Sequence, residues 1–251
     1  MSIARLLFLI AVSCVPLSFA SAQNPFENPK NLTVLPKDIS PERLRDIMRG
    51  FTFATGERCS YCHVRVEDEK GAHMDFESDD KETKAVTREM MKMVGSINQN
   101  IRSLDRGADH HFTRVMCTTC HRGQANPMLI EQVMDEQIAD GGTAAAKAKY
   151  NELKDKYYGK GTFDFSGFTM AEYANSLLEE NKFDAALDMA MFSREIAPGD
   201  SYTHTMVGNV YMKEKKYADA IKAYEAALAI SPDEGSLKRQ IDVAKKAMAG
   251  Q

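Results

Sequence analysis

The sequence predicts an all-α protein of two domains, and three observations lead to this prediction. Apolar residues recur at i, i+3, i+4 and i+7 over long stretches, which is the spacing of one helical face. Two Cys-x-x-Cys-His segments lie in the first half of the chain, and a 34-residue repeat lies in the second half. Convincing alternation of apolar and polar residues is lacking, so we expect no β-sheet.

The composition is that of an ordinary soluble protein. At 251 residues the chain is long enough for one large domain or two ordinary ones. Charged residues make up 27% and hydrophobic residues 43% of it. A net charge of −4 and a pI near 5.9 give no support for nucleic-acid binding.

Residues 1–22 have the features of a secretory signal peptide. Arg5 gives a positive start, an apolar run follows from Leu6, and residues 20–22 (Ala-Ser-Ala) form a cleavage site. The run is too short and too interrupted for a membrane span. We therefore expect a protein that is exported to the periplasm or another extracytoplasmic space and is soluble after cleavage. Lipidation of Cys14 is the alternative, although the three residues before it fit a lipobox poorly.

Two five-residue segments carry the predicted chemistry: Cys59-Ser60-Tyr61-Cys62-His63 and Cys117-Thr118-Thr119-Cys120-His121. This is the attachment pattern of c-type haem. Two thiols about one helical turn apart add across the two vinyl groups of the porphyrin, and the next histidine becomes the proximal iron ligand. We expect two covalent haems, attached at Cys59, Cys62, Cys117 and Cys120, with His63 and His121 as metal ligands.

Other uses of these cysteines are possible. An exported protein can form disulfides. A zinc site would have its Cys-x-x-Cys pairs about 15–20 residues apart, whereas 54 residues separate Cys62 from Cys117. A thioredoxin-like redox motif belongs near a βαβ pattern, which is absent from this sequence.

A six-coordinate haem needs a second axial ligand, and methionine is the choice of cytochromes c because it raises the reduction potential. Before the first motif, Ser40 and Pro41 give a helix-start signal and Gly56 a stop. One face of this helix carries an apolar stripe with a methionine in it: Leu44, Ile47, Met48 and Phe51. Met48 is therefore the first candidate ligand.

A longer helix is predicted before the second motif, from Lys81 to about Arg102. Its apolar face carries Val86, Met90, Met93, Val94, Ile97 and Ile101, and its opposite face carries Glu82, Lys84, Arg88 and Lys92. Met91 falls off the stripe, which leaves Met90 and Met93 as candidates. Packing in an apolar core is the alternative role of any of these methionines.

Residues 31–128 resemble a known family. The segments NLTVLPKDISPERLRDIMRGF…CSYCH and TKAVTREMMKMVGSINQN…VMCTTCHRGQANP are similar to the first two haem segments of the cytochrome subunit of bacterial photosynthetic reaction centres. The resemblance implies that His63 and Met48 bind the first iron and that His121 and Met90 bind the second, with Met93 packing nearby. Family members commonly carry four haems, whereas this chain has two motifs. The spacing from Met48 to Cys59 is also slightly short.

Further side chains can contribute to the haem sites. His73, His110 and His111 are alternative ligands that would give bis-histidine sites. Arg114 and Arg122 can pair with haem propionates. Residues 67–82 hold eight acidic side chains against two lysines, which can steer a basic partner if they lie beside a haem edge. Ordinary solvated surface is the alternative for all of them.

The second half of the chain contains no further haem motif. Residues 129–165 predict a connecting helix and loop, with Tyr150, Leu153 and Tyr157 on one helical face. NKFDAAL at 181–187 then matches KKYADAI at 215–221 with an offset of 34 residues, the period of tetratricopeptide repeats (TPRs).

The second repeat copy fits the TPR pattern well through Gly208, Tyr211, Ala220, Tyr224, Ala227 and Pro232, and residues 235–249 predict a capping helix. Two repeats are fewer than a self-sufficient array needs, so we expect support from neighbouring elements. We divide the chain into a signal peptide, a dihaem cytochrome c domain, a linker, and two TPR-like repeats with a cap: residues 1–22, 23–128, 129–165 and 166–251.

The sequence thus predicts an all-α, multihaem c-type cytochrome domain followed by a short TPR α-hairpin array. Its expected function is to carry single electrons between redox protein partners, with the TPR unit for docking, assembly or association with a membrane complex. With both axial positions filled, we expect no enzymatic activity. A dihaem peroxidase-like enzyme with one open iron site is one alternative, suggested by the short Met48 spacing. A scaffold that assembles a larger complex is another.

Overall fold

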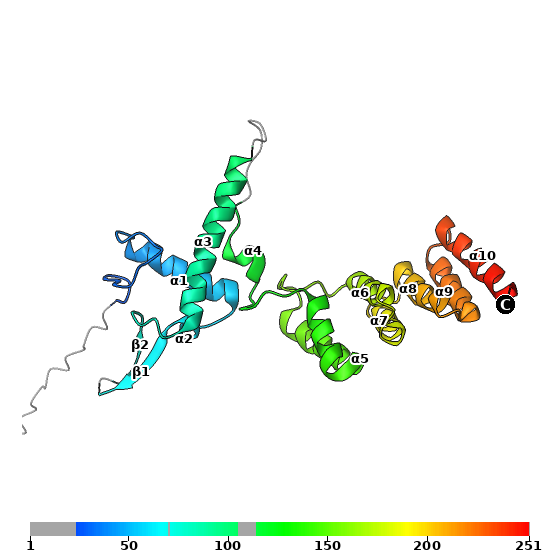
Figure 1. The fold of residues 1–251 in the computed structure, drawn as a ribbon, viewed down its shortest axis with the longest axis horizontal. Coiled ribbons are helices and arrows are strands. Elements are labelled where there is room, and N and C mark those ends of the chain that lie inside the picture. Colours follow the sequence, from blue (N-terminus) through cyan, green and yellow to red (C-terminus); the bar gives the residue numbers. More distant parts are fainter. Residues whose placement is uncertain (1–23, 70, 105–113, 251) are drawn as a thin grey trace, which may run out of the picture.

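The computed structural model describes residues 24–69, 71–104 and 114–250, and Figure 1 shows their path. The predicted signal peptide with Cys14, and the candidate ligands His110 and His111, lie outside these residues. Ten helices and one β-hairpin form in the described part, which confirms the predicted all-α class. No described helix is long and apolar enough to cross a membrane.

The helix predicted before the first motif is α1, Pro41–Thr55. The Ser40 hydroxyl accepts a hydrogen bond from the backbone N–H of Arg43 at 3.2 Å, so it acts as the N-cap. Gly56 ends the helix with φ 74°, a left-handed conformation that favours glycine. The second predicted helix is α3, Glu82–Ser103, one residue from the expected bounds at each end. Both helices are therefore confirmed.

A short β-hairpin, which the sequence did not lead us to expect, connects the first motif to α3. Strand β1, Val64–Asp68, pairs antiparallel with β2, Gly71–Asp75, with Val64 opposite Asp75 and Asp68 opposite Gly71. The sequence signals of this hairpin are the alternating Val64 and Val66 and the glycine at position 71. Gly71 adopts φ 91° at the start of β2. Five residues per strand are too few for periodicity to stand out against the surrounding charges.

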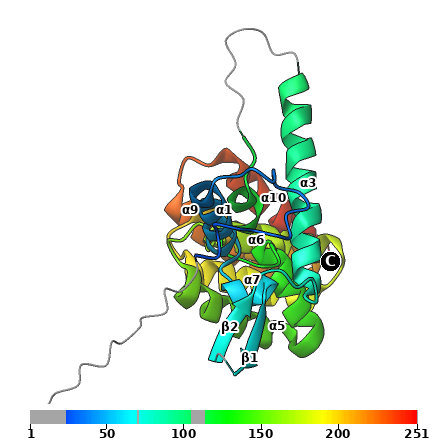
Figure 2. The same cartoon turned by 90° about the vertical axis from the view of Figure 1, so that its left-hand side faces the viewer.

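The two haem motifs form short helices, α2 (Cys59–Cys62) and α4 (Cys117–His121). Helix α4 packs against α1, and α2 packs against α3. Each motif therefore contacts the helix that precedes the other motif in the sequence, so the two haem segments cross. Figure 2 faces this end of the molecule and shows α3 extending beyond the other elements.

The second half consists of helix hairpins in sequence order: α5 (Ile130–Tyr157), α6 (Gly167–Glu179), α7 (Phe183–Ile196), α8 (Ser201–Lys213), α9 (Tyr217–Ile230) and α10 (Gly235–Ala249). Helices α6 to α9 are the two predicted repeats, and α10 occupies the residues predicted for the cap. Asn181 and Lys215 both have positive φ, 60° and 59°, at equivalent turns 34 residues apart. The repeat is therefore visible in the backbone as well as in the sequence.

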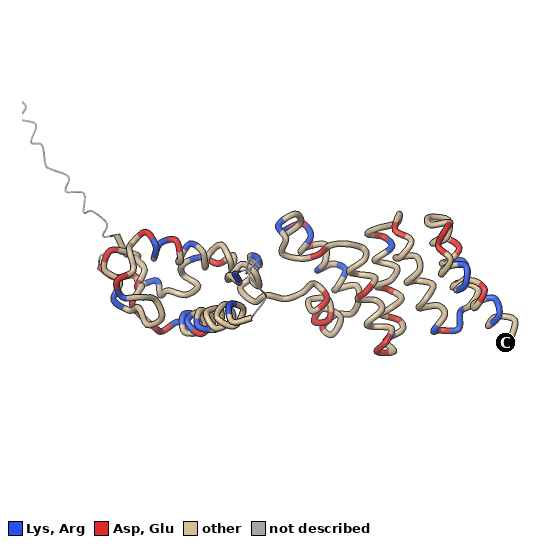
Figure 3. The backbone as a smooth tube through the Cα atoms, turned by 90° about the horizontal axis from the view of Figure 1, so that it is seen from above, with Lys and Arg blue, Asp and Glu red and all other residues tan. Residues whose placement is uncertain are grey.

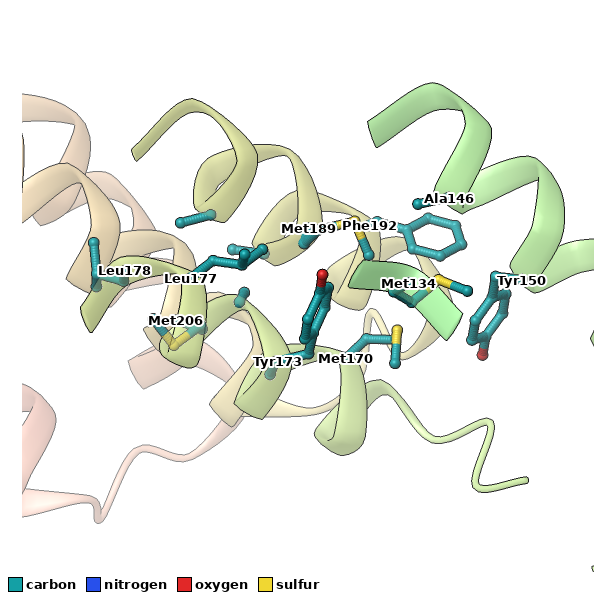
Figure 4. Close-up of a cluster of buried hydrophobic side chains, with 14 of the residues drawn as sticks. Met134, Ala146, Tyr150, Met170, Tyr173, Leu177, Leu178, Met189, Phe192 and Met206 are labelled. Atoms are coloured by element: carbon teal, nitrogen blue, oxygen red, sulfur yellow. The ribbon is translucent and has the colours of Figure 1, made fainter. Parts of the chain in front are cut away.

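The stretch predicted as a connecting helix is part of the hydrophobic core of this half. Gly142 has φ 75° and breaks α5 into two helical halves. Figure 4 shows side chains from both halves lying among those of α6 and α7: Met134, Ala146, Tyr150, Met170, Tyr173, Leu177, Met189 and Phe192. The Tyr173 hydroxyl also donates to Asp135 at 2.7 Å. Helix α5 thus acts as a further hairpin and supplies the support that two repeats need.

Close packing inside the second repeat gives a testable prediction. A Cβ at Gly208 would lie 2.4 Å from the ring of Tyr224, which is buried in α9. We expect Gly208→Val to lower the free energy of unfolding by about 1–3 kcal/mol through overpacking. Gly199→Val is the matched control, because a Cβ at Gly199 would meet no atom within 4 Å. Urea unfolding followed by helical circular dichroism measures the difference, and equal stability of the two variants would contradict the packing.

Candidate haem sites in the N-terminal half

The first motif is held in place by α3. The backbone N–H of His63 donates to the Cys59 carbonyl at 2.9 Å, closing one helical turn that carries both thiols. From α3, the Thr83 hydroxyl donates to the Tyr61 carbonyl at 2.6 Å. The Cys62 sulfur lies 3.7 Å from the Thr87 hydroxyl oxygen. Both cysteines are free thiols, one exposed and one half-buried.

The His63 imidazole has an unusual environment. Its Nδ1 is buried and has no hydrogen-bond partner among the described residues. The ring of Phe76 packs edge-on against it, with 5.0 Å between ring centroids. Burial, and next the positive charge of Lys84, lower the pKa of His63, which favours the neutral imidazole that binds iron.

The second motif is fixed from three sides. Before it, the Asn98 side chain of α3 accepts from the backbone N–H of Val115 and donates to its carbonyl, both at 2.8 Å. After it, the N–H of Gly123 donates to the Ala54 carbonyl at the end of α1, at 2.7 Å. The Thr162 hydroxyl donates to the Arg122 carbonyl at 2.8 Å. The motif therefore sits between α3, α1 and the loop that leads to the repeats.

His121 has the partner that His63 lacks. Its Nδ1 lies 2.8 Å from the backbone carbonyl of Gln124. A carbonyl only accepts hydrogen bonds, so Nδ1 carries the proton and the Nε2 lone pair is free for a metal. This is the usual arrangement of a metal-binding histidine.

Most apolar side chains around the motifs are exposed or half-buried rather than packed into a protein core. Leu44 and Ala54 are the only buried hydrophobic residues in the described part before residue 130. The predicted stripe of α3 is open: Val86, Met90, Met93 and Ile97 are 47%, 42%, 49% and 36% exposed. Such a surface needs a large apolar partner. Free thiols in pairs, two imidazoles and an uncovered apolar face fit covalently attached haem c.

The other uses of the cysteines find no support in the described residues. All four cysteines there are free, and they lie in two separate helices. No group of three or more His, Cys, Asp or Glu side chains in the described ranges converges as a metal-ion site.

A model of the photosynthetic reaction centre cytochrome C subunit family matches residues 11–170, well over half of the chain. The chain belongs to this family. Its members are electron-transfer proteins that bind haem c, which confirms the resemblance noted in the sequence. The match includes α5 and reaches the start of α6, beyond the two haem segments.

A tetratricopeptide repeat model matches residues 201–234, the second repeat. Two solved structures are similar in part. The first TPR domain of the human RPAP3 protein is 15% identical in sequence, with a TM-score of 0.35. The match covers 48% of this chain and 91% of the RPAP3 domain. MamA from AMB-1 is 13% identical in sequence, with a TM-score of 0.33. The match covers 66% of this chain and 79% of the MamA chain.

The structure places the predicted methionines on the expected helices. Met48 is half-buried on α1, one turn after the buried Leu44. Met90 and Met93 lie exposed on α3, and Met91 is half-buried away from their stripe. The cytochrome family makes methionine a natural axial ligand, but the pairing of Met48 with His63 and of Met90 with His121 stays a prediction.

The alternative ligands and cations remain at the surface. His73 is exposed on β2, where its Nδ1 lies 3.8 Å from an Asp68 carboxylate oxygen and 3.2 Å from the Gly71 carbonyl. Arg114 and Arg122 are exposed beside the second motif. Their pairing with haem propionates stays a prediction.

Sequence reasoning missed a polar network at the start of α3. Lys84, placed on the polar face of the predicted helix, is only 8% exposed. Its ammonium donates to the carbonyls of Phe76, Glu77 and Ser78 at 3.1, 3.1 and 2.6 Å, and lies 3.0 Å from Asp79. Asp79 also pairs with Arg88 at 3.0 Å and accepts from Asn31 at 2.8 Å. Helical periodicity gives no sign of a loop folding back over a charged face.

This network makes stability depend on pH. Hydrogen bonds from Arg88, Asn31 and Lys84 hold the pKa of Asp79 well below its usual range. Its contribution to stability is therefore complete above the unfolded pKa of about 4 and is lost as the pH falls through the lower folded pKa.

We expect Asp79→Asn to lower the urea midpoint near neutral pH and to reduce the further loss on acidification below about pH 4. Asp80→Asn is the control, since the Asp80 side chain makes no hydrogen bond or ion pair within the described residues. Urea titrations at several pH values measure both effects. A parent and an Asp79→Asn protein with identical acid profiles would show that the network does not couple to folding.

Proposed function

We propose that this chain is an exported dihaem c-type cytochrome that carries single electrons between redox protein partners. The observation that carries the proposal is the pair of Cys-x-x-Cys-His helices, packed on α3 and α1 in a half of the chain with exposed apolar side chains, in a member of a cytochrome family. Export rests on the signal features of residues 1–22. A periplasmic or other extracytoplasmic location is part of the same proposal.

In this proposal each side chain has a defined role. The four thiols would attach the two macrocycles, and His63 and His121 would bind the irons. Haem c, when bound, supplies an iron centre that gains and loses one electron. Met48 and Met90 would each supply a thioether ligand to one iron, which would leave no position open for a substrate. The crossed packing of the motifs holds both sites in one small domain.

The acidic segment before α3 offers a surface for a redox partner. The network around Asp79 and the 3.3 Å pair between Lys30 and Glu77 neutralise part of its charge. Glu57, Asp80 and Glu82 remain, with the single lysine Lys81, around a recess of about 460 Å³ that also borders Tyr61 of the first motif. We propose that a basic partner docks there, since opposite charge speeds productive encounters.

The repeats offer a second surface, at the C-terminal end. A recess of about 280 Å³ lies between α8, α9 and α10, lined by Met212, Tyr224, Ser236, Arg239, Gln240 and Val243. Val243 is 56% exposed, and Arg239 makes no ion pair within the described residues. Figure 3 shows several basic residues along α10. We propose that this end of the TPR unit docks a partner protein or membrane complex.

Ligand variants test the electron carrier. We expect Met90→Ala and Met48→Ala each to remove one of two long-wavelength methionine–iron absorption bands, because a thioether ligand is lost. Met93→Ala is the matched control on the same helical stripe and should retain both bands. Retention of both bands in Met90→Ala or Met48→Ala would overturn that ligand assignment. A parent protein with a high-spin oxidised site that responds to peroxide would favour the peroxidase-like enzyme instead.

Point variants test the docking surface better than truncation, because removal of residues 166–251 would uncover the core that α5 shares with α6 and α7. We expect Arg239→Glu and Val243→Asp in the full chain to abolish co-purification with the cell's membrane redox complex. Lys238→Glu, on the neighbouring position of α10, is the charge-matched control. Unchanged co-purification in all three variants would remove this surface from the proposal and would count against the scaffold role.

A further inference from the structure

The two proximal histidines differ in what their Nδ1 atoms face. His121 donates to the Gln124 carbonyl at 2.8 Å, whereas the buried Nδ1 of His63 has no partner among the described residues. The edge-on ring of Phe76, 5.0 Å away, lies against the His63 imidazole. The first site therefore has an apolar neighbour beside its histidine, where the second site has a hydrogen-bond acceptor.

Lys84 explains why Phe76 stays in this position. Its almost buried ammonium donates hydrogen bonds to the backbone carbonyls of residues 76, 77 and 78. It also forms an ion pair with Asp79, the next residue of the same loop, at 3.0 Å. Fixing the carbonyl of Phe76 itself holds the segment at the start of α3, and α3 in turn holds the first motif through Thr83 and Thr87. Lys84 therefore connects the loop, the aromatic ring and the histidine.

The missing hydrogen bond at His63 Nδ1 and the positive charge of Lys84 both act to raise the reduction potential of the first site. A histidine that donates from Nδ1 becomes a more basic ligand, which favours the oxidised metal and lowers the potential. His63 lacks that bond. A nearby positive charge favours the added electron and raises the potential. Lys84 and Arg88 are the cations that act on His63 and Asp75 is the anion, and Asp79 pairs with both cations at 3.0 Å.

We propose that the His63 site has the higher reduction potential of the two, and that Lys84 is the positioning residue that maintains it. Electrons then pass from the His121 site, nearest the repeats, to the His63 site, beside the acidic segment. The inference rests on the proposed function, since it needs two haems with the same methionine–histidine ligation. With like ligands at both irons, surroundings decide the order of the potentials.

Redox titration of the full-length, haem-loaded protein tests this order. We compare the parent with Lys84→Met, which removes the clamp and its charge, and with Phe76→Ser, which leaves the clamp and lets water reach Nδ1. In both variants we expect the higher potential to fall and the lower one to stay. A tenfold change in the electron distribution between the sites corresponds to a shift of about 59 mV. Lys92→Met is the matched control, an exposed lysine of α3 paired with Glu89, and should move neither potential.

The variants also identify the sites, because both substitutions are local to His63. A fall confined to the lower potential would reverse the proposed order, and unchanged potentials in both variants would remove the role of Lys84. Either result overturns the inference. The parent protein tests the proposed function separately, through its two methionine bands. If Lys84→Met fails to fold by circular dichroism, Phe76→Ser alone decides the order, since its backbone carbonyl remains available to Lys84.

Discussion

The close approach of Gly56 and Gly123 is the constraint on which the haem-binding half depends. A Cβ at Gly56 would lie 2.5 Å from the Gly123 carbonyl oxygen, and both glycines have positive φ. The neighbouring hydrogen bond from Gly123 to the Ala54 carbonyl joins the end of α1 to the end of the second motif. This contact sets the crossing of the two haem segments. The first motif begins three residues after Gly56, so one contact positions both.

Elsewhere in this half, side-chain hydrogen bonds to the backbone hold the elements together, as a hydrophobic core does in most domains. Asn98 holds Val115, Thr83 holds Tyr61, and Lys84 holds the loop that begins at Phe76. Each of these donors has its acceptors, as buried polar groups require. Hydrophobic surface is left free for the macrocycles, which would bury it when bound. The polar contacts thus fix the backbone of the two motifs, while the apolar stripe of α3 stays exposed.

The second half is built in the opposite way. Helices α5 to α8 share an extensive apolar core, to which α5 contributes Met134, Ala146 and Tyr150, and α9 and α10 form a second, smaller cluster. The loop after α5 then returns to the second haem motif through Thr162 and Arg122. A segment that the family model includes therefore packs with the repeats and also contacts a haem segment.

The sequence alone predicted the haem-attachment motifs, the helices and the repeat. These are local properties: the spacing of thiols and histidine, caps such as Ser40 and Gly56, and the offset between Asn181 and Lys215 are all set within a few residues or one period. Helical face left Met48, Met90 and Met93 as candidate ligands, and the family resemblance paired Met48 with His63 and Met90 with His121, a pairing that stays a prediction.

Only the tertiary structure decided which polar groups meet across the chain. The burial of Lys84 depends on a loop that folds back over α3, and helical periodicity assigns that face to solvent. The difference between His63 and His121 depends on Phe76 and on the Gln124 carbonyl, which no spacing rule encodes. The crossing of α1 with α4 depends on two glycines 67 positions apart. Long-range backbone contacts of this kind follow from the packing of the whole chain, because no local pattern specifies them.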